Sequence, residues 1–150
     1  MKPMFVLLGI FALASLYSKI FHPTLELAWA GRIAMALMLI FTAIGHFAFA
    51  KGMAAMVPSF IPWKYELVIG TGILEVVFAL GLLLPGYRDL TGWFLILFFI
   101  LVLPANIKAA LDGLDYQTGA LDGPGVAYLW FRIPLQVGFI VWVYFAAVRG

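Results

Sequence analysis

The sequence predicts an all-α protein, a bundle of helices that span a membrane. Hydrophobic residues make up 65% of the 150 residues, charged residues make up only 11%, and the mean hydropathy is +1.10. Soluble domains are about half apolar and about one quarter charged, and a soluble core of this size cannot bury so much apolar surface. The excess lies in five long apolar stretches, without the short alternating segments of a membrane β-barrel. We therefore expect a location in the cell membrane, with the lipid bilayer as a partner.

The first apolar stretch, at about 4–21, is the least typical span. Met4–Ser18 is apolar enough to enter lipid, and the Lys19 side chain can reach back to the interface. The Ala-Leu-Ala sequence at 12–14 also resembles a signal-peptidase site behind a short apolar run. Only Lys2 supplies positive charge ahead of that run, so we favour a spanning helix over a cleaved signal segment.

The other stretches lie at about 27–50, 67–84, 90–111 and 126–148. Each is close to or above the roughly 18–20 residues that a helix needs to cross about 30 Å of hydrocarbon. Glycine and proline interrupt the chain between them, which is typical of connecting loops. No internal repeat, low-complexity segment or second domain is visible, so residues 1–150 are expected to form a single transmembrane domain.

The basic residues do not orient the bundle. Each side of the predicted spans has four of them: Lys2, Lys51, Lys64 and Lys108 on one side, and Lys19, Arg32, Arg88 and Arg149 on the other. The positive-inside rule therefore favours neither orientation. The acidic loop at 112–125 and the weak first span favour placing the 51–66 side outside the cytoplasm.

Charge, cysteine content and motifs exclude several functional classes. The net charge is only +2 and no basic run is present, so nucleic acid is not an expected partner. The absence of cysteine removes disulfides, thiolate metal sites and thiol redox chemistry, and the two histidines, His22 and His46, lie at opposite ends of one span and cannot share a metal. No hydrolase, metalloprotease, phosphate-binding or dinucleotide-binding motif occurs, so no catalytic residue can be assigned. No metal and no intrinsic cofactor are expected, and an electron-transfer role would depend on a quinone or on a partner's cofactor.

A small set of polar residues inside the spans carries the functional prediction. A carboxylate near the middle of a span costs about 3 kcal/mol, so Glu75 is expected to have a partner or a role. Because successive spans alternate in direction, His46 near the end of the second span and Glu75 in the third lie toward the same side. Asn106 ends the fourth span there, and Arg132 and Gln136 lie roughly 9 and 15 Å into the fifth, at 1.5 Å per residue. All five residues are therefore expected in one half of the bundle.

These residues predict a polar pocket. Arg132 and Gln136 share one helical face, and Pro104 and Pro134 free backbone carbonyls that need protein or water partners at membrane depth. We expect a direct or water-bridged ion pair between Glu75 and Arg132, in a cavity under the loops at 51–66 and 109–125. His46, Asn106 and Gln136 are expected as hydrogen-bonding partners for a ligand. The alternative is structural: an ion pair and interhelical hydrogen bonds that only hold the helices together.

In order along the chain, several short motifs resemble the DoxX family of small integral membrane proteins. The resemblance covers residues from about 31 to 144, and the ordered set is more specific than any single motif. The motifs are Gly45-His46-Phe47, Met56-Val57-Pro58, Ile61-Pro62, Gly72 with Glu75, Leu83-Leu84-Pro85, Pro104-Ala105-Asn106-Ile107 and Arg132-Ile133-Pro134-Leu135-Gln136. Ala50 departs from the proline that many relatives have there.

The resemblance implies an antiparallel four-helix DoxX-like core with an additional N-terminal transmembrane helix. It also implies a small subunit beside a membrane or peripheral oxidoreductase, in quinone-linked oxidation or an oxidative-stress complex. We expect a redox-linked accessory subunit that binds a quinone or a similar small apolar molecule through His46, Glu75, Asn106, Arg132 and Gln136. The alternatives are a non-catalytic carrier of a small hydrophobic compound and a structural subunit of a membrane complex.

Overall fold

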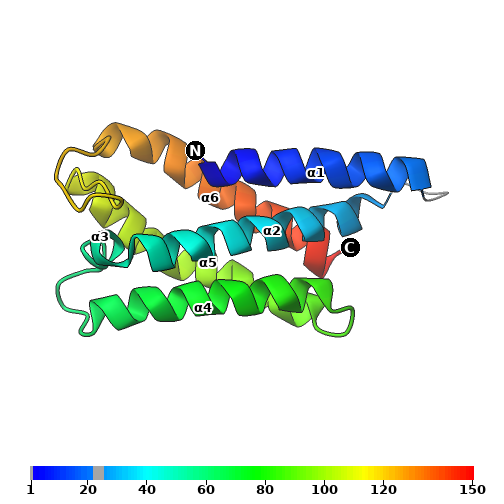
Figure 1. Ribbon diagram of the computed structural model, residues 1–150, viewed down its shortest axis with the longest axis horizontal. Coiled ribbons are helices and arrows are strands. Elements are labelled where there is room, and N and C mark those ends of the chain that lie inside the picture. Colours follow the sequence, from blue (N-terminus) through cyan, green and yellow to red (C-terminus); the bar gives the residue numbers. More distant parts are fainter. Residues whose placement is uncertain (1, 22–25) are drawn as a thin grey trace.

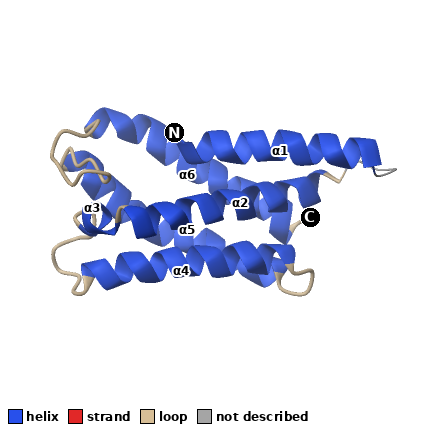
Figure 2. Cartoon of the chain, in the orientation of Figure 1, coloured by secondary structure: helices blue, strands red, loops and turns tan. Residues whose placement is uncertain are grey.

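The computed structural model describes residues 2–21 and 26–150, which fold into helices joined by short loops, with no strand in these two segments (Figures 1 and 2). Five helical segments are long and apolar enough to cross a membrane. These are α1 (Lys2–Phe21), α2 (Leu27–Ala48), α4 (Lys64–Leu83), α5 (Arg88–Leu111), and a last segment made of η1 (Val126–Tyr128), α6 (Leu129–Val143) and the π-helical turn η2 (Tyr144–Val148). The five predicted helices are therefore confirmed, with boundaries that differ by a few residues.

The end of the second span differs from the prediction in its backbone geometry. The predicted stretch at 27–50 is divided, because α2 ends at Ala48 and the short helix α3 (Ala50–Ala54) follows after Phe49. The Phe49 backbone leaves helical geometry, with φ −118° and ψ 26°, although its N–H still donates to the Gly45 carbonyl at 2.9 Å. The chain turns here toward the loop that leads to α4.

Four of the long helices form a closed ring in the order α2, α4, α5 and α6 with η2, which packs back on α2. The closest packing is between α2 and α4, and successive helices run in opposite directions (Figure 1). In this ring α4 and α6 are diagonal and barely touch. The additional helix α1 packs on the outside of α2; it begins about half-way along the bundle and extends past one end (Figure 1).

The core and the outer surface are both apolar. Fully buried side chains fill the centre of the ring, among them Met35, Leu39, Leu82, Leu95 and Val143. Many large apolar side chains on the outer faces of the helices are exposed, including Leu80, Ile100, Leu101, Trp130 and Phe145. Water would penalise such a surface, whereas lipid tails would not. The surface is therefore compatible with a protein embedded in a membrane.

Candidate functional site

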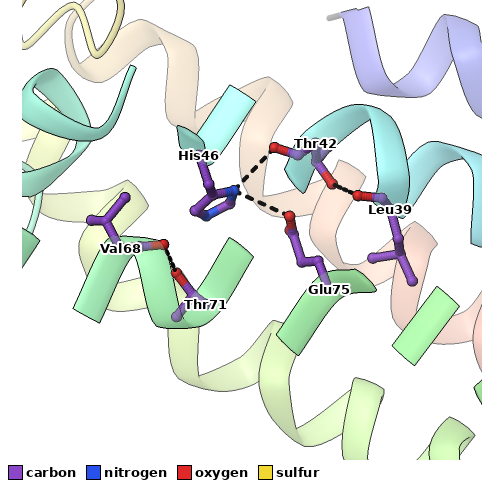
Figure 3. A network of polar contacts seen from close by, with 6 residues as sticks. All are labelled: Leu39, Thr42, His46, Val68, Thr71 and Glu75. Carbon is purple, nitrogen blue, oxygen red and sulfur yellow. Dashed lines mark hydrogen bonds and ion pairs between the residues drawn. The ribbon is translucent and has the colours of Figure 1, made fainter. Parts of the chain in front are cut away.

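A buried pair between α2 and α4 is the centre of the candidate site. The Nδ1 atom of His46 lies 3.1 Å from the Oε2 atom of Glu75, and the two side chains point toward each other across the helix interface (Figure 3). Glu75 is 5% exposed, and its side chain lies in the α2–α4 interface rather than on the outer surface of the bundle. The prediction that Glu75 has a partner inside the span is confirmed, with His46 as that partner.

The contacts of His46 locate one proton on its ring. Nδ1 also lies 3.0 Å from the backbone carbonyl oxygen of Thr42, one helical turn earlier on α2 (Figure 3). A carbonyl and a carboxylate both accept hydrogen bonds, so Nδ1 must hold the proton and Nε2 is left for another group. The Nδ1–H bonds to the Thr42 carbonyl, and the carboxylate lies beside it outside good donor geometry. Glu75 Oε2 consequently has no hydrogen bond among the described residues.

One threonine lies a helical turn before each member of the pair: Thr42 before His46 on α2, and Thr71 before Glu75 on α4. The Thr42 hydroxyl donates to the Leu39 carbonyl at 3.0 Å, and the Thr71 hydroxyl donates to the Val68 carbonyl at 2.8 Å (Figure 3). Both hydroxyls are thus satisfied within their own helices and place additional oxygen atoms near the pair. Thr42 was not among the residues predicted from the sequence, although its spacing of four residues from His46 is the signal that could have found it.

Close packing at Gly72 makes the pair possible. A Cβ atom built on Gly72 would lie 2.8 Å from His46 Cβ and 3.3 Å from the Phe47 ring. Since real Cβ contacts are longer, any larger residue at position 72 would push α4 away from α2 at the level of the pair. A glycine three residues before Glu75 therefore allows the two backbones to approach.

We expect Gly72→Ala to lower the free energy of unfolding by about 2 kcal/mol, the typical cost of overpacking a tight interface. Thermal unfolding in detergent, followed by circular dichroism, measures this loss. Gly70→Ala is the matched control, because a Cβ at Gly70 on the same helix meets no atom within 4 Å. Equal stability of the two variants would show that α2 and α4 are not in close contact at this point.

Gln136 links α6 to α5 near the same depth. Its Nε2 donates to the Phe99 backbone carbonyl at 2.8 Å, and the residue is 2% exposed. Its Oε1 has no hydrogen bond among the described residues, as for Glu75 Oε2. The predicted interhelical role of Gln136 fits this contact, and its free amide oxygen is a second buried acceptor in the core.

Asn106 and Arg132 do not join the pair. Asn106 donates from Nδ2 to the Val102 carbonyl of its own helix at 3.1 Å. Arg132 is partly buried and makes no hydrogen bond or ion pair within the described part of the chain; Tyr128, Tyr116 and Glu75 are its electrostatic neighbours. The predicted direct contact between Glu75 and Arg132 is therefore wrong. The reason is the helix order: Glu75 is on α4 and Arg132 is on α6, which are diagonal in the ring.

Two apolar pockets lie on the surface of the bundle, in the half that contains the α4–α5 turn and the end of η2. One, of about 420 Å³, lies between α4 and α5 near Leu84 and Tyr87. The other, of about 480 Å³, lies between α1, α2 and α6 near Gly31 and Ala146, beside Arg32. Neither is lined by any of the five predicted site residues, so neither is the cavity that the sequence predicts under the loops at 51–66 and 109–125.

No cluster of three or more His, Asp or Glu side chains suited to a metal ion occurs among residues 2–21 and 26–150. His22, the second histidine of the chain, lies outside the described residues.

Residues 35–147 match the family described as Domain of unknown function (DUF8561). The chain belongs to this family. The matched region of the DUF8561 protein begins within α2 and ends in η2, so it contains nearly the whole four-helix ring and the His46–Glu75 pair, and it leaves α1 outside. No curated protein and no solved structure matches the chain.

Proposed function

We propose that this DUF8561 protein is a DoxX-like integral protein of the cell membrane that binds the head of a quinone-type molecule at the His46–Glu75 pair. In this proposal it acts as an accessory subunit of a membrane or peripheral oxidoreductase. The observation that carries the proposal is the 3.1 Å contact between His46 and Glu75, in which Glu75 is buried and its Oε2 atom lacks a hydrogen bond within the described part of the chain. A buried ionisable pair at membrane depth marks a functional site more often than a stabilising one.

The geometry favours approach of a ligand to the imidazole. The His46 side chain is 17% exposed and that of Glu75 only 7%, so a molecule arriving from lipid meets His46 first. With the proton on Nδ1, the Nε2 atom can accept a hydrogen bond from a quinol hydroxyl. If that hydroxyl proton moves to Nε2, the carboxylate of Glu75 stabilises the resulting imidazolium, as a carboxylate does behind a catalytic histidine. The two electrons of the quinol and the proton of its second hydroxyl pass to the partner oxidoreductase.

An apolar body for the ligand has a surface beside the pair. Phe47 follows His46 directly, is 47% exposed, and has its ring against Gly72 of α4. Flat apolar rings pack well on aromatic side chains, and the outer faces of α2 and α4 continue as apolar surface. A quinone with its head at His46 would lie with its ring on Phe47 and its tail in lipid.

Quinone binding tests the proposal. The purified protein in lipid nanodiscs is titrated with a short-chain ubiquinone, and binding is followed by quenching of its tryptophan fluorescence. We expect saturable binding that Glu75→Gln and His46→Asn weaken about tenfold, a loss of about 1.4 kcal/mol. Glu66→Gln is the matched control, because Glu66 is an exposed carboxylate in the first turn of the same helix.

Two outcomes would redirect the proposal. Absence of saturable binding by the unmodified protein would leave the pair with a purely structural role, as a link between α2 and α4. The alternative function, a carrier of a small hydrophobic compound, would be favoured by a different result. In that case proteoliposomes with the protein would take up a labelled hydrophobic compound, and the protein would not affect quinol oxidation by a partner complex.

A further inference from the structure

The second apolar pocket has the form of a lipid-facing groove at the other end of the bundle. It lies where α1, α2 and α6 meet, and its walls are apolar: Phe11, Ala28, Val141, Trp142, Phe145 and Ala146. Leu27, Gly31 and Gly138 complete the lining. A Cβ at Gly138 would meet no atom within 4 Å, so the groove is open at this point. With a volume of about 480 Å³, it is large enough for part of an acyl chain.

An oriented guanidinium borders this groove. Arg32 donates from Nη1 to the Ala146 carbonyl at 2.9 Å, one of the terminal carbonyls of the last helical segment that lacks an intrahelical donor. Trp142 donates from Nε1 to the Gly31 carbonyl at 3.0 Å, which holds α6 against α2 at the same level. The other N–H groups of Arg32 make no hydrogen bond or ion pair with any described residue, so they remain available to an anion beside the groove.

Further positive charge surrounds the same end. The Arg149 guanidinium lies 5.9 Å from the centre of the Phe145 ring, which itself lines the groove. Arg88, at the start of α5, is an electrostatic neighbour of Arg32, and Glu26 is the acidic neighbour. Arg32 and Arg149 therefore lie beside the apolar groove, at an end of the bundle that also holds Arg88, Glu26 and Asp89. Two guanidinium groups beside an apolar groove suit a ligand with an anionic head and an apolar tail.

We infer that this groove binds an anionic phospholipid, with its phosphate at Arg32 and Arg149 and one acyl chain along Gly138 and Phe11. Arginine favours phosphate because its planar guanidinium donates two parallel hydrogen bonds. The orientation predicted from the loops places this end on the cytoplasmic side, where anionic lipids attract basic residues. This site is separate from the His46–Glu75 pair and does not depend on the proposed function.

Native mass spectrometry of the detergent-purified protein tests the inference with two added lipids, phosphatidylglycerol and phosphatidylcholine. We expect retention of phosphatidylglycerol over phosphatidylcholine, and about a tenfold loss of that retention for Arg32→Gln combined with Arg149→Gln. Lys51→Gln, which removes an exposed charge at the opposite end, should leave retention unchanged. Inorganic phosphate should not compete, since it has no tail for the groove.

A second variant covers the case in which the arginine substitutions prevent folding. Gly138→Leu fills the groove without changing charge, and the open space at this position predicts that it folds normally. It should reduce phosphatidylglycerol retention as well. Equal retention by the unmodified protein and the Gly138→Leu variant, or equal loss in Lys51→Gln, would overturn the inference.

Discussion

Replacement of Glu75 by alanine is expected to lower the free energy of unfolding by about 3 kcal/mol, because it removes the buried contact with His46 and leaves a cavity between α2 and α4. Glu75 is 5% exposed and faces His46, so neither water nor another described side chain can replace it. Glu75→Gln should lose only about 1 kcal/mol, since the amide keeps the volume of the side chain and places a polar group beside His46. Thermal unfolding in detergent, followed by circular dichroism, gives the comparison.

Glu66→Ala is the control for these two variants, because Glu66 is exposed on the same helix and should be almost neutral when replaced. Equal stability of Glu75→Ala and Glu66→Ala would contradict a buried partner for Glu75.

Gly52→Ala is expected to be the most disruptive glycine substitution. A Cβ at Gly52 in α3 would lie 2.0 Å from the Tyr116 carbonyl oxygen and 2.8 Å from its carbonyl carbon. These are backbone atoms that cannot rotate away, so α3 and the loop at 112–125 must separate. We expect a loss of about 3 kcal/mol, at the upper end of overpacking costs, together with faster proteolysis in that loop.

Gly45→Ala provides the comparison, because a Cβ at Gly45 meets no atom within 4 Å and alanine is favoured over glycine within a helix. If Gly52→Ala were as stable and as resistant to protease as Gly45→Ala, the loop would not pack on α3 at Tyr116.

Sequence alone was sufficient for the helices because the number and length of apolar stretches determine them. The sequence also predicts that His46 and Glu75 lie toward the same side of the bundle, because successive helices alternate in direction. It did not identify the partner of Glu75, because partner choice depends on the order of helices around the ring. That order places α4 beside α2 and diagonal to α6, so the nearest cation by depth, Arg132, is not the nearest in space.

The sequence contains less information about how closely the helices pack and where pockets form between them. Gly72 lies three residues before Glu75 and allows close approach, but its position in the sequence does not show which helix packs there. The Arg32 groove depends on the π-helical turn at Tyr144–Val148, and neither the apolar pattern nor any motif in the sequence predicted that turn. The apolar pockets depend on how helices diverge, which periodicity cannot show.

A double-mutant cycle tests the central claim that His46 is the partner of Glu75. The first cycle measures the stabilities of Glu75→Gln, His46→Asn and the variant that combines them. A second cycle measures Glu75→Gln, Arg132→Gln and their combination, and the two coupling energies are compared. We predict a coupling energy of about 1–2 kcal/mol between Glu75 and His46, as for residues in contact, and less than about 0.5 kcal/mol between Glu75 and Arg132. A larger coupling with Arg132 than with His46 would contradict the assignment of His46 as the partner.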